Sequence, residues 1–212
     1  MQSSLQTLYR YWDEVRAGRL APQRLDIEPS RIAAILAETF MLELVDPGTY
    51  PYRLAGTRLC EMFGSELRGK NFLDSWSTED RRVIEGCLAA VSEQGAAAHL
   101  ILEGVLDARH RVELEANLLP LLHAGGVTRI IGAMSPRSAP HWLGSEPLRS
   151  RRLTQHRLLW PDGCPHATLT LRHASQAPPL APLATPGGSV KADQRRFRVL
   201  EGGRASGKPD KR

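Results

Sequence analysis

The sequence predicts an α+β domain with one antiparallel sheet of five strands and helices packed on one face of it. The order of segments indicates this class, because two short strand-like segments are followed by helical segments and then by three longer strand-like segments. The segment 111–122 shows the clearest pattern, since apolar and polar residues alternate from Arg111 to Leu118, as on a strand with one solvated face. A change in composition after Pro136 marks the end of this domain.

The charges divide the chain into a folded part and a basic tail. Up to Pro136 there are 14 Lys and Arg residues against 18 Asp and Glu residues, and after it there are 14 against 5. The last 76 residues also hold 9 of the 15 prolines. We therefore expect N-terminal helices over 1–36, a core domain over 37–136, and a basic, Pro- and Ala-rich, largely disordered tail over 137–212.

The segment before the core domain predicts an amphipathic helix. Ser3 or Ser4 can cap it, and Gly18 can end it. Its apolar residues recur at helical spacing: Leu5, Leu8, Tyr9, Trp12 and Val15. A short second helix is expected from Pro29, a residue suited to a first helical turn, to Leu36.

The core domain is expected to begin with a hairpin and a short helix. Residues 40–45 and 52–55 are strand-like, and the Asp-Pro-Gly-Thr-Tyr segment 46–50 between them has turn chemistry. The apolar spacing over 57–63 predicts a short helix, which Gly64 can end.

A longer helix and three strands complete the core domain. Ser77 or Thr78 can cap the helix, two acidic residues in its first turn complement its dipole, and Gly95 can end it. The strands are expected over 99–106, 111–122 and 127–134.

The stretch GSELRGKN at 64–71 differs by one residue from the phosphate-binding loop G-x-x-x-x-G-K-[ST]. Asn71 occupies the position of the hydroxyl that would bind magnesium, and Glu66 would repel a phosphate. The segment before it is expected to be helical, whereas a phosphate loop lies between a strand and a helix. We therefore expect no nucleotide site here, and we expect Gly64 and Gly69 to turn the chain between two short helical segments.

Catalytic and metal-binding motifs do not stand out. Cys164 and His166 form one pair of candidate ligands, but no second pair at zinc spacing accompanies them. Cys60 and Cys87 lie on apolar faces of expected helices, as reduced structural thiols do. The chain lacks the G-x-S-x-G sequence of a nucleophile elbow, so a non-catalytic protein is expected.

The sequence also predicts a cytoplasmic location. No apolar run reaches the length needed to span a bilayer. The first 18 residues are interrupted by charges and lack the apolar region of a secretory signal.

Four segments carry a resemblance to a known family: LYRYWDEVR (8–16), YRLAGTRLCEMFG (52–64), ELRGKNFLDSW (66–76) and IIGAMSP (130–136). They resemble the PAS domain, and most closely its small stand-alone bacterial branch in the alphaproteobacteria. The resemblance implies a five-stranded sheet with a ligand pocket between the sheet and its helices. On this basis the candidate pocket residues are Phe63, Phe72, Trp76 and Cys87.

The resemblance also bears on cofactors and partners. The helix expected over 79–94 lacks the histidine by which some PAS domains hold haem, and no flavin-type cysteine motif is found, so the cofactor stays unknown. PAS domains dimerise through the sheet or an N-terminal helix. This makes Leu8, Tyr9 and Trp12 the candidate surface for a homodimer or another protein partner.

We therefore expect a non-catalytic sensory or adaptor protein that acts in signalling through a small-molecule ligand, a protein partner, or both. The alternative is a protein that binds nucleic acid or an anionic membrane surface through its tail. Basic runs at 149–157 and 193–198 motivate this alternative.

Overall fold

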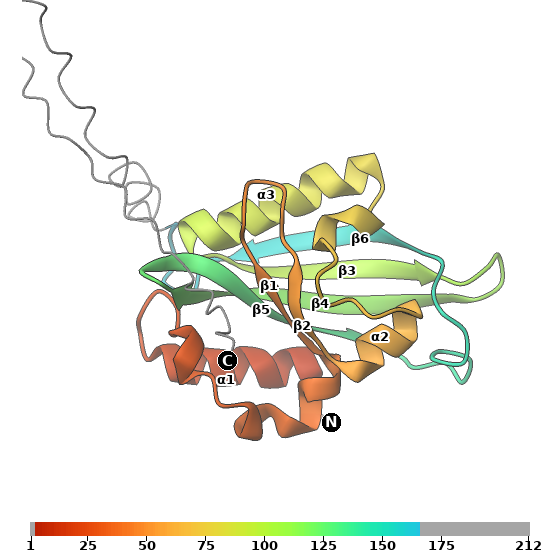
Figure 1. Ribbon diagram of the computed structural model, residues 1–212, viewed down its shortest axis with the longest axis horizontal. Helices are drawn as coiled ribbons and strands as arrows, with labels where there is room; N and C mark the ends of the chain where they lie inside the picture. Colours follow the sequence, from red (N-terminus) through yellow and green to blue (C-terminus); the bar gives the residue numbers. More distant parts are fainter. Residues whose placement is uncertain (1–2, 166–212) are drawn as a thin grey trace, which may run out of the picture. The chain divides into compact units, whose positions relative to one another are not determined.

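The computed structural model describes residues 3–165, which form a six-stranded antiparallel sheet with helices on both faces (Figure 1). Along the sheet the strands follow the order β2-β1-β5-β4-β3-β6. The strands are β1 (Thr39–Glu43), β2 (Tyr52–Ala55), β3 (Ala97–Val105), β4 (Arg111–His123), β5 (Gly126–Pro136) and β6 (Ser150–Leu159). The helices are α1 (Ser4–Arg16), α2 (Thr57–Phe63) and α3 (Thr78–Gln94), with 3-10 helices η1 (Arg24–Asp26), η2 (Pro29–Glu38) and η3 (Phe72–Ser75).

The ends of the helices follow from the capping residues. The Ser3 side chain accepts a hydrogen bond from the backbone of Gln6 at the start of α1, and Ser77 accepts one from Asp80 at the start of α3. Gly95 ends α3 in the left-handed conformation, at φ 68°. The α1 helix ends one residue earlier than expected, because Ala17 itself adopts a left-handed φ of 48°.

Each face of the sheet is buried under a different set of helices. On one face α2, η3 and α3 cover a large core that includes Leu114 and Leu118 of β4. On the other face α1 and η2 cover a smaller core that includes Leu119 and Leu121 of the same strand. Figure 1 shows α3 and α1 on opposite sides of the sheet. The buried residues separate into two cores because the side chains of neighbouring residues in a strand point to opposite faces of the sheet.

The sixth strand corrects two of our expectations. β6 pairs antiparallel with β3, from Ala97 opposite Leu159 to Val105 opposite Ser150. The sheet therefore has one strand more than the five expected, and the sequence 150–159 is part of the fold rather than of a disordered tail beginning at 137. The remainder of that tail, 166–212, lies outside the described residues, and so does the basic run at 193–198.

Candidate functional site

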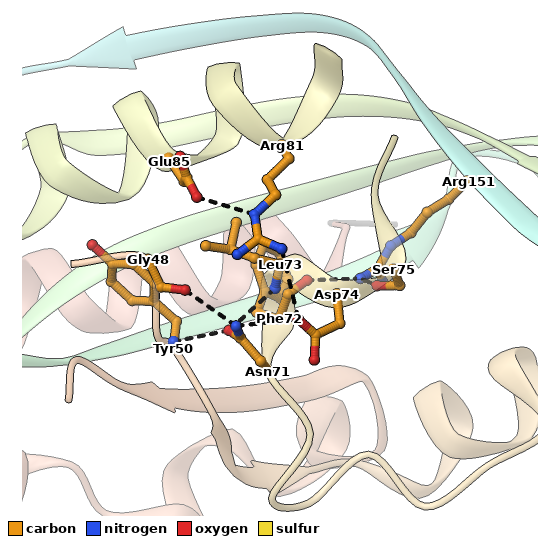
Figure 2. Close-up of polar contacts among 10 residues, drawn as sticks. All are labelled: Gly48, Tyr50, Asn71, Phe72, Leu73, Asp74, Ser75, Arg81, Glu85 and Arg151. Atoms are coloured by element: carbon orange, nitrogen blue, oxygen red, sulfur yellow. Dashed lines mark hydrogen bonds and ion pairs between the residues drawn. The ribbon is translucent and has the colours of Figure 1, made fainter. Parts of the chain in front are cut away.

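Asn71 ties three segments together at the start of η3 (Figure 2). Its Oδ1 accepts hydrogen bonds from the backbone N–H of Tyr50 (2.9 Å) and of Leu73 (3.3 Å), the second of which caps η3. Its Nδ2 donates to the carbonyl of Gly48 (3.1 Å) and to the carboxylate of Asp74 (3.3 Å). The residue that departs from the phosphate-loop pattern thus has a structural role of its own.

Backbone N–H groups of the preceding loop also have hydrogen-bond acceptors within the protein. The N–H of Gly69 donates to the carbonyl of Tyr52 in β2 (2.8 Å), and the N–H of Lys70 donates to the carbonyl of Leu67 (3.0 Å). The N–H of Arg68 donates to the carboxylate of Glu66 (3.0 Å). A phosphate loop needs such N–H groups free to face the phosphates. The geometry agrees with our reading of 64–71 as a connecting segment.

Aromatic side chains pack under this loop. Phe72 of η3 is fully buried, stacks on Phe40 of β1 at 5.9 Å between ring centroids, and meets the edge of the Tyr52 ring at 5.7 Å. Trp76 lies 5.8 Å from Phe72. Burial raises the pKa of the Tyr52 hydroxyl, and the positive charge of nearby Arg151 and a hydrogen bond to its side chain oppose this shift only in part.

The guanidinium of Arg151 lies among these rings. It is 4.3 Å from the ring centroid of Trp76, 4.9 Å from that of Phe63 and 5.3 Å from that of Phe72, distances at which a cation and an aromatic ring attract each other. Arg151 is only 6% exposed, although it belongs to the edge strand β6. One cation thus joins the sixth strand to α2 and η3.

The polar contacts of Arg151 are incomplete. Its Nη2 donates to the carbonyl of Phe72 (3.2 Å) and to the hydroxyl of Ser75, as Figure 2 shows. Its Nε is buried and has no hydrogen-bond partner, and within residues 3–165 no carboxylate forms an ion pair with it. A buried charge without a counter-ion is costly, and ring stacking offsets only part of that cost.

A pocket of about 510 Å³ opens beside Arg151. Its walls come from β2, from the end of α2 and the following loop (63–75), and from residues 148–151 at and before the start of β6. They include Phe63, Leu67 and Leu148 as apolar groups and Lys70 as a second cation. The pocket therefore brings together the loop that resembles a phosphate-binding motif and the buried cation of the sixth strand.

The structure gathers three of the four candidate pocket residues around one group. The rings of Phe63, Phe72 and Trp76 all face the Arg151 guanidinium. Cys87 is buried on α3 in the same core, and burial raises the pKa of its thiol. It makes none of the described contacts to Arg151, so the four residues do not form one cluster.

Sequence reasoning missed Arg151 and assigned it to a solvated basic run. The available signal was the two-residue period of 151–153, which puts Arg151 on the same side of the strand as Leu153. That signal was weak, because the burial of an arginine depends on rings supplied by α2 and η3.

The candidate partner surface on α1 is mostly inside the fold. Leu8 and Trp12 are fully buried against the sheet, and the indole N–H of Trp12 donates to the carbonyl of Pro120 (2.8 Å). Tyr9 is half-buried and lines a pocket between α1 and the sheet. With α1 packed in this way, Tyr9 is the member of the trio that a partner can reach.

Two structural features are absent from residues 3–165. No group of three or more His, Cys, Asp or Glu residues is placed there to hold a metal ion. In the same part of the chain, no helix is both long and apolar enough to cross a membrane.

Comparison with solved structures returned matches to light-oxygen-voltage (LOV) proteins, all with low TM-scores. A variant of RsLOV matches with a TM-score of 0.40 at 14% identity, over 51% of this chain and 66% of that one, which is just under two thirds of its length. The Rhodobacter sphaeroides LOV protein matches with a TM-score of 0.39 at 12% identity, over 54% and 71%. An RNA-binding Light-Oxygen-Voltage receptor matches with a TM-score of 0.38 at 18% identity, over 59% and 37%.

The family of the chain follows from a comparison with family models. No curated protein matched the chain significantly. A family model described as PAS domain matches residues 1–135, which include α1 and the strands β1 to β5 but not β6. This match covers more than half of the sequence and agrees with the antiparallel sheet and its covering helices. The chain belongs to the PAS domain family.

Proposed function

We propose that this chain is a non-catalytic sensory or adaptor protein that acts in signalling through ligand binding, protein contact, or both. The observation that carries the proposal is the family match over residues 1–135, because PAS domains generally act in sensory signalling. The pocket beside Arg151 supports the ligand-binding part, since it combines apolar walls with a few polar groups. We further propose that it acts in the bacterial cytoplasm.

Affinity purification of the full chain from its native cell tests this proposal. Mass spectrometry of the eluate should identify a signalling protein, a released small molecule, or both. A matched control is the variant Ser65→Trp, which fills the pocket and should release the small molecule while keeping a protein partner bound elsewhere. Turnover of a co-purified compound by the chain alone would contradict the non-catalytic role.

Self-association is a second part of the proposal. Tyr9 and the pocket beside it, which Leu5 and Leu159 also line, offer a partly apolar surface next to α1. Light scattering of the full chain should show a dimer that Tyr9→Glu weakens. A chain that is monomeric at all concentrations would contradict the proposed self-association. The sensory role would then require a different protein partner or a ligand.

The alternative function is binding to nucleic acid or to an anionic membrane surface. The structure adds one observation in its favour, since Arg149, Arg152 and Arg157 are all exposed on or beside β6, although Arg152 pairs with Glu103. Such binding should weaken steeply with salt. A deletion that tests the tail should begin after residue 165, because removing 149–212 would also remove β6.

A further inference from the structure

We propose that the pocket beside Arg151 binds a small organic carboxylate with an apolar body, and that its carboxylate pairs with the Arg151 guanidinium. This inference rests on the ligand-binding part of the proposed function and names the class of ligand. The site depends on β6, which lies beyond the residues that the PAS family model matches.

The first argument is the missing counter-ion. Arg151 is held in place on several sides, by three aromatic rings and by hydrogen bonds to the carbonyl of Phe72 and the hydroxyl of Ser75. Its charge is nonetheless not neutralised by any carboxylate of residues 3–165, and its Nε has no partner. A fixed guanidinium that has an unpaired Nε–H and lacks a counter-ion matches the charge and the planar geometry of a carboxylate.

The second argument is the balance of charge in the pocket. Three cationic side chains line it, namely those of Lys70, Arg149 and Arg151, against the single carboxylate of Asp74. The Asp74 carboxylate is already engaged, because it accepts a hydrogen bond from Asn71 and lies 3.8 Å from the guanidinium of Arg81. The pocket as a whole therefore favours an anion.

The third argument is the size and nature of the walls. At about 510 Å³ the pocket is much larger than an inorganic anion needs and falls in the range of sites for small organic molecules. Phe63, Leu67 and Leu148 give it apolar surface next to the cation. This combination selects an acid with a hydrocarbon or aromatic body over phosphate alone.

The test is isothermal titration of the full chain with benzoate, phenylacetate, indole-3-acetate and hexanoate. Benzamide serves as the neutral counterpart of benzoate, and inorganic phosphate and ATP serve as other anions. We expect at least one acid to bind, and we expect benzamide and phosphate to bind about tenfold more weakly or not at all. No binding of any acid, or equal binding of an acid and benzamide or phosphate, would overturn the proposal.

Variants locate the site. Arg151→Gln should weaken binding of the acid about tenfold or more, because it removes the charge-assisted contact. Arg152→Gln is the matched control: this neighbour on the same strand is exposed and should leave the affinity within about twofold. If Arg151→Gln fails to fold, binding of the acid to Ser65→Trp tests the site instead, since this variant fills the pocket without altering Arg151. Undiminished binding in Ser65→Trp would place the acid elsewhere and refute the site.

The two proposals fail in different ways. If no acid binds but affinity purification yields a signalling partner or another small molecule, the carboxylate site is wrong and the sensory role stands. If an acid binds at Arg151 but the chain is found to convert it, the site stands and the non-catalytic role is wrong.

Discussion

At the scale of single residues, Asn71 shows how a motif can be nearly matched for an unrelated reason. Its four hydrogen bonds hold the hairpin turn at Gly48 and Tyr50 against the first turn of η3. Both a donor and an acceptor are needed for this, and a hydroxyl at the same position would reach fewer of these partners. The hydrogen bonds within the loop therefore explain the asparagine. The turns at Gly64 and Gly69 explain the spacing of the two glycines.

The variant Asn71→Ser makes this argument testable, because it completes the phosphate-loop pattern. We expect it to lower the free energy of unfolding by about 1–2 kcal/mol, since partly buried backbone groups lose their partners. We also expect it to gain no affinity for magnesium ATP. Denaturant unfolding and calorimetry measure the two effects, with Lys70→Gln as a control that alters an exposed residue of the same loop. Binding of ATP by the variant would show that the loop can act as a phosphate site.

Gly64 and Gly69 give a second test at this scale. Both have positive φ, 60° and 83°, so alanine is strained at each. A Cβ at Gly64 would lie only 2.4 Å from the Cβ of Pro147, whereas at Gly69 it would meet nothing within 4 Å. Gly64→Ala should therefore destabilise the protein by about 1 kcal/mol more than Gly69→Ala, which costs about 1–2 kcal/mol. Equal losses in thermal or urea unfolding would contradict the close contact between the end of α2 and the segment leading to β6.

At the scale of elements, α1 is attached to the sheet by polar contacts as well as by apolar packing. Trp12 donates to the carbonyl of Pro120, and the side chain of Asn117 donates to the carbonyl of Leu5 (3.1 Å) while accepting from the N–H of Ala133 (2.8 Å). These bonds cross a buried face, where unpaired polar groups are costly. They fix the direction of the helix on the sheet.

The variant Trp12→Phe tests this attachment. It keeps most of the apolar packing but leaves the carbonyl of Pro120 without its donor, so we expect a loss of about 1–3 kcal/mol in the free energy of unfolding. Tyr9→Phe should change stability by less than about 0.5 kcal/mol, because Tyr9 is only half-buried. If the loss in Trp12→Phe instead grew as the protein was diluted, α1 would be packing on a second copy of the chain, as the sequence-based hypothesis for Leu8 and Trp12 supposed.

The elements that could be predicted from sequence are those whose signals are local. The caps at Ser3 and Ser77, the turn at 46–50 and the alternation in the first half of β4 each depend on neighbouring residues, and the structure has these features where they were expected. The solvated face expected for β4 is wrong at Asn117, because α1 packs on that side of the sheet and buries it. β6 was missed because its evidence is not local. Most of its side chains are exposed, and its one buried residue is Arg151, whose environment is supplied by residues 63–76.

At the scale of the whole molecule, the position of Arg151 makes β6 part of the site as well as part of the sheet. The strand covers the edge of β3 with a long antiparallel pairing, and its arginine fills a space between aromatic rings of the helical layer. We therefore expect that a domain boundary at Pro136 would cut through one cooperative unit. A free edge on β3 would also invite pairing with other chains.

Two shortened chains test this view of the unit. A chain ending at residue 165 retains β6, whereas one ending at Pro136 loses the strand, the Arg151 cation and one wall of the pocket. We expect the thermal midpoint of the shorter chain to lie at least about 10 °C lower, because the loss costs several kcal/mol and each kcal/mol shifts the midpoint by a few degrees. We also expect the shorter chain to associate through its exposed β3 edge. Calorimetry and light scattering at matched concentration measure both effects. Equal midpoints and a shared monomeric state would mean that the domain folds completely without its sixth strand, and that β6 is an addition to the fold rather than a part of it.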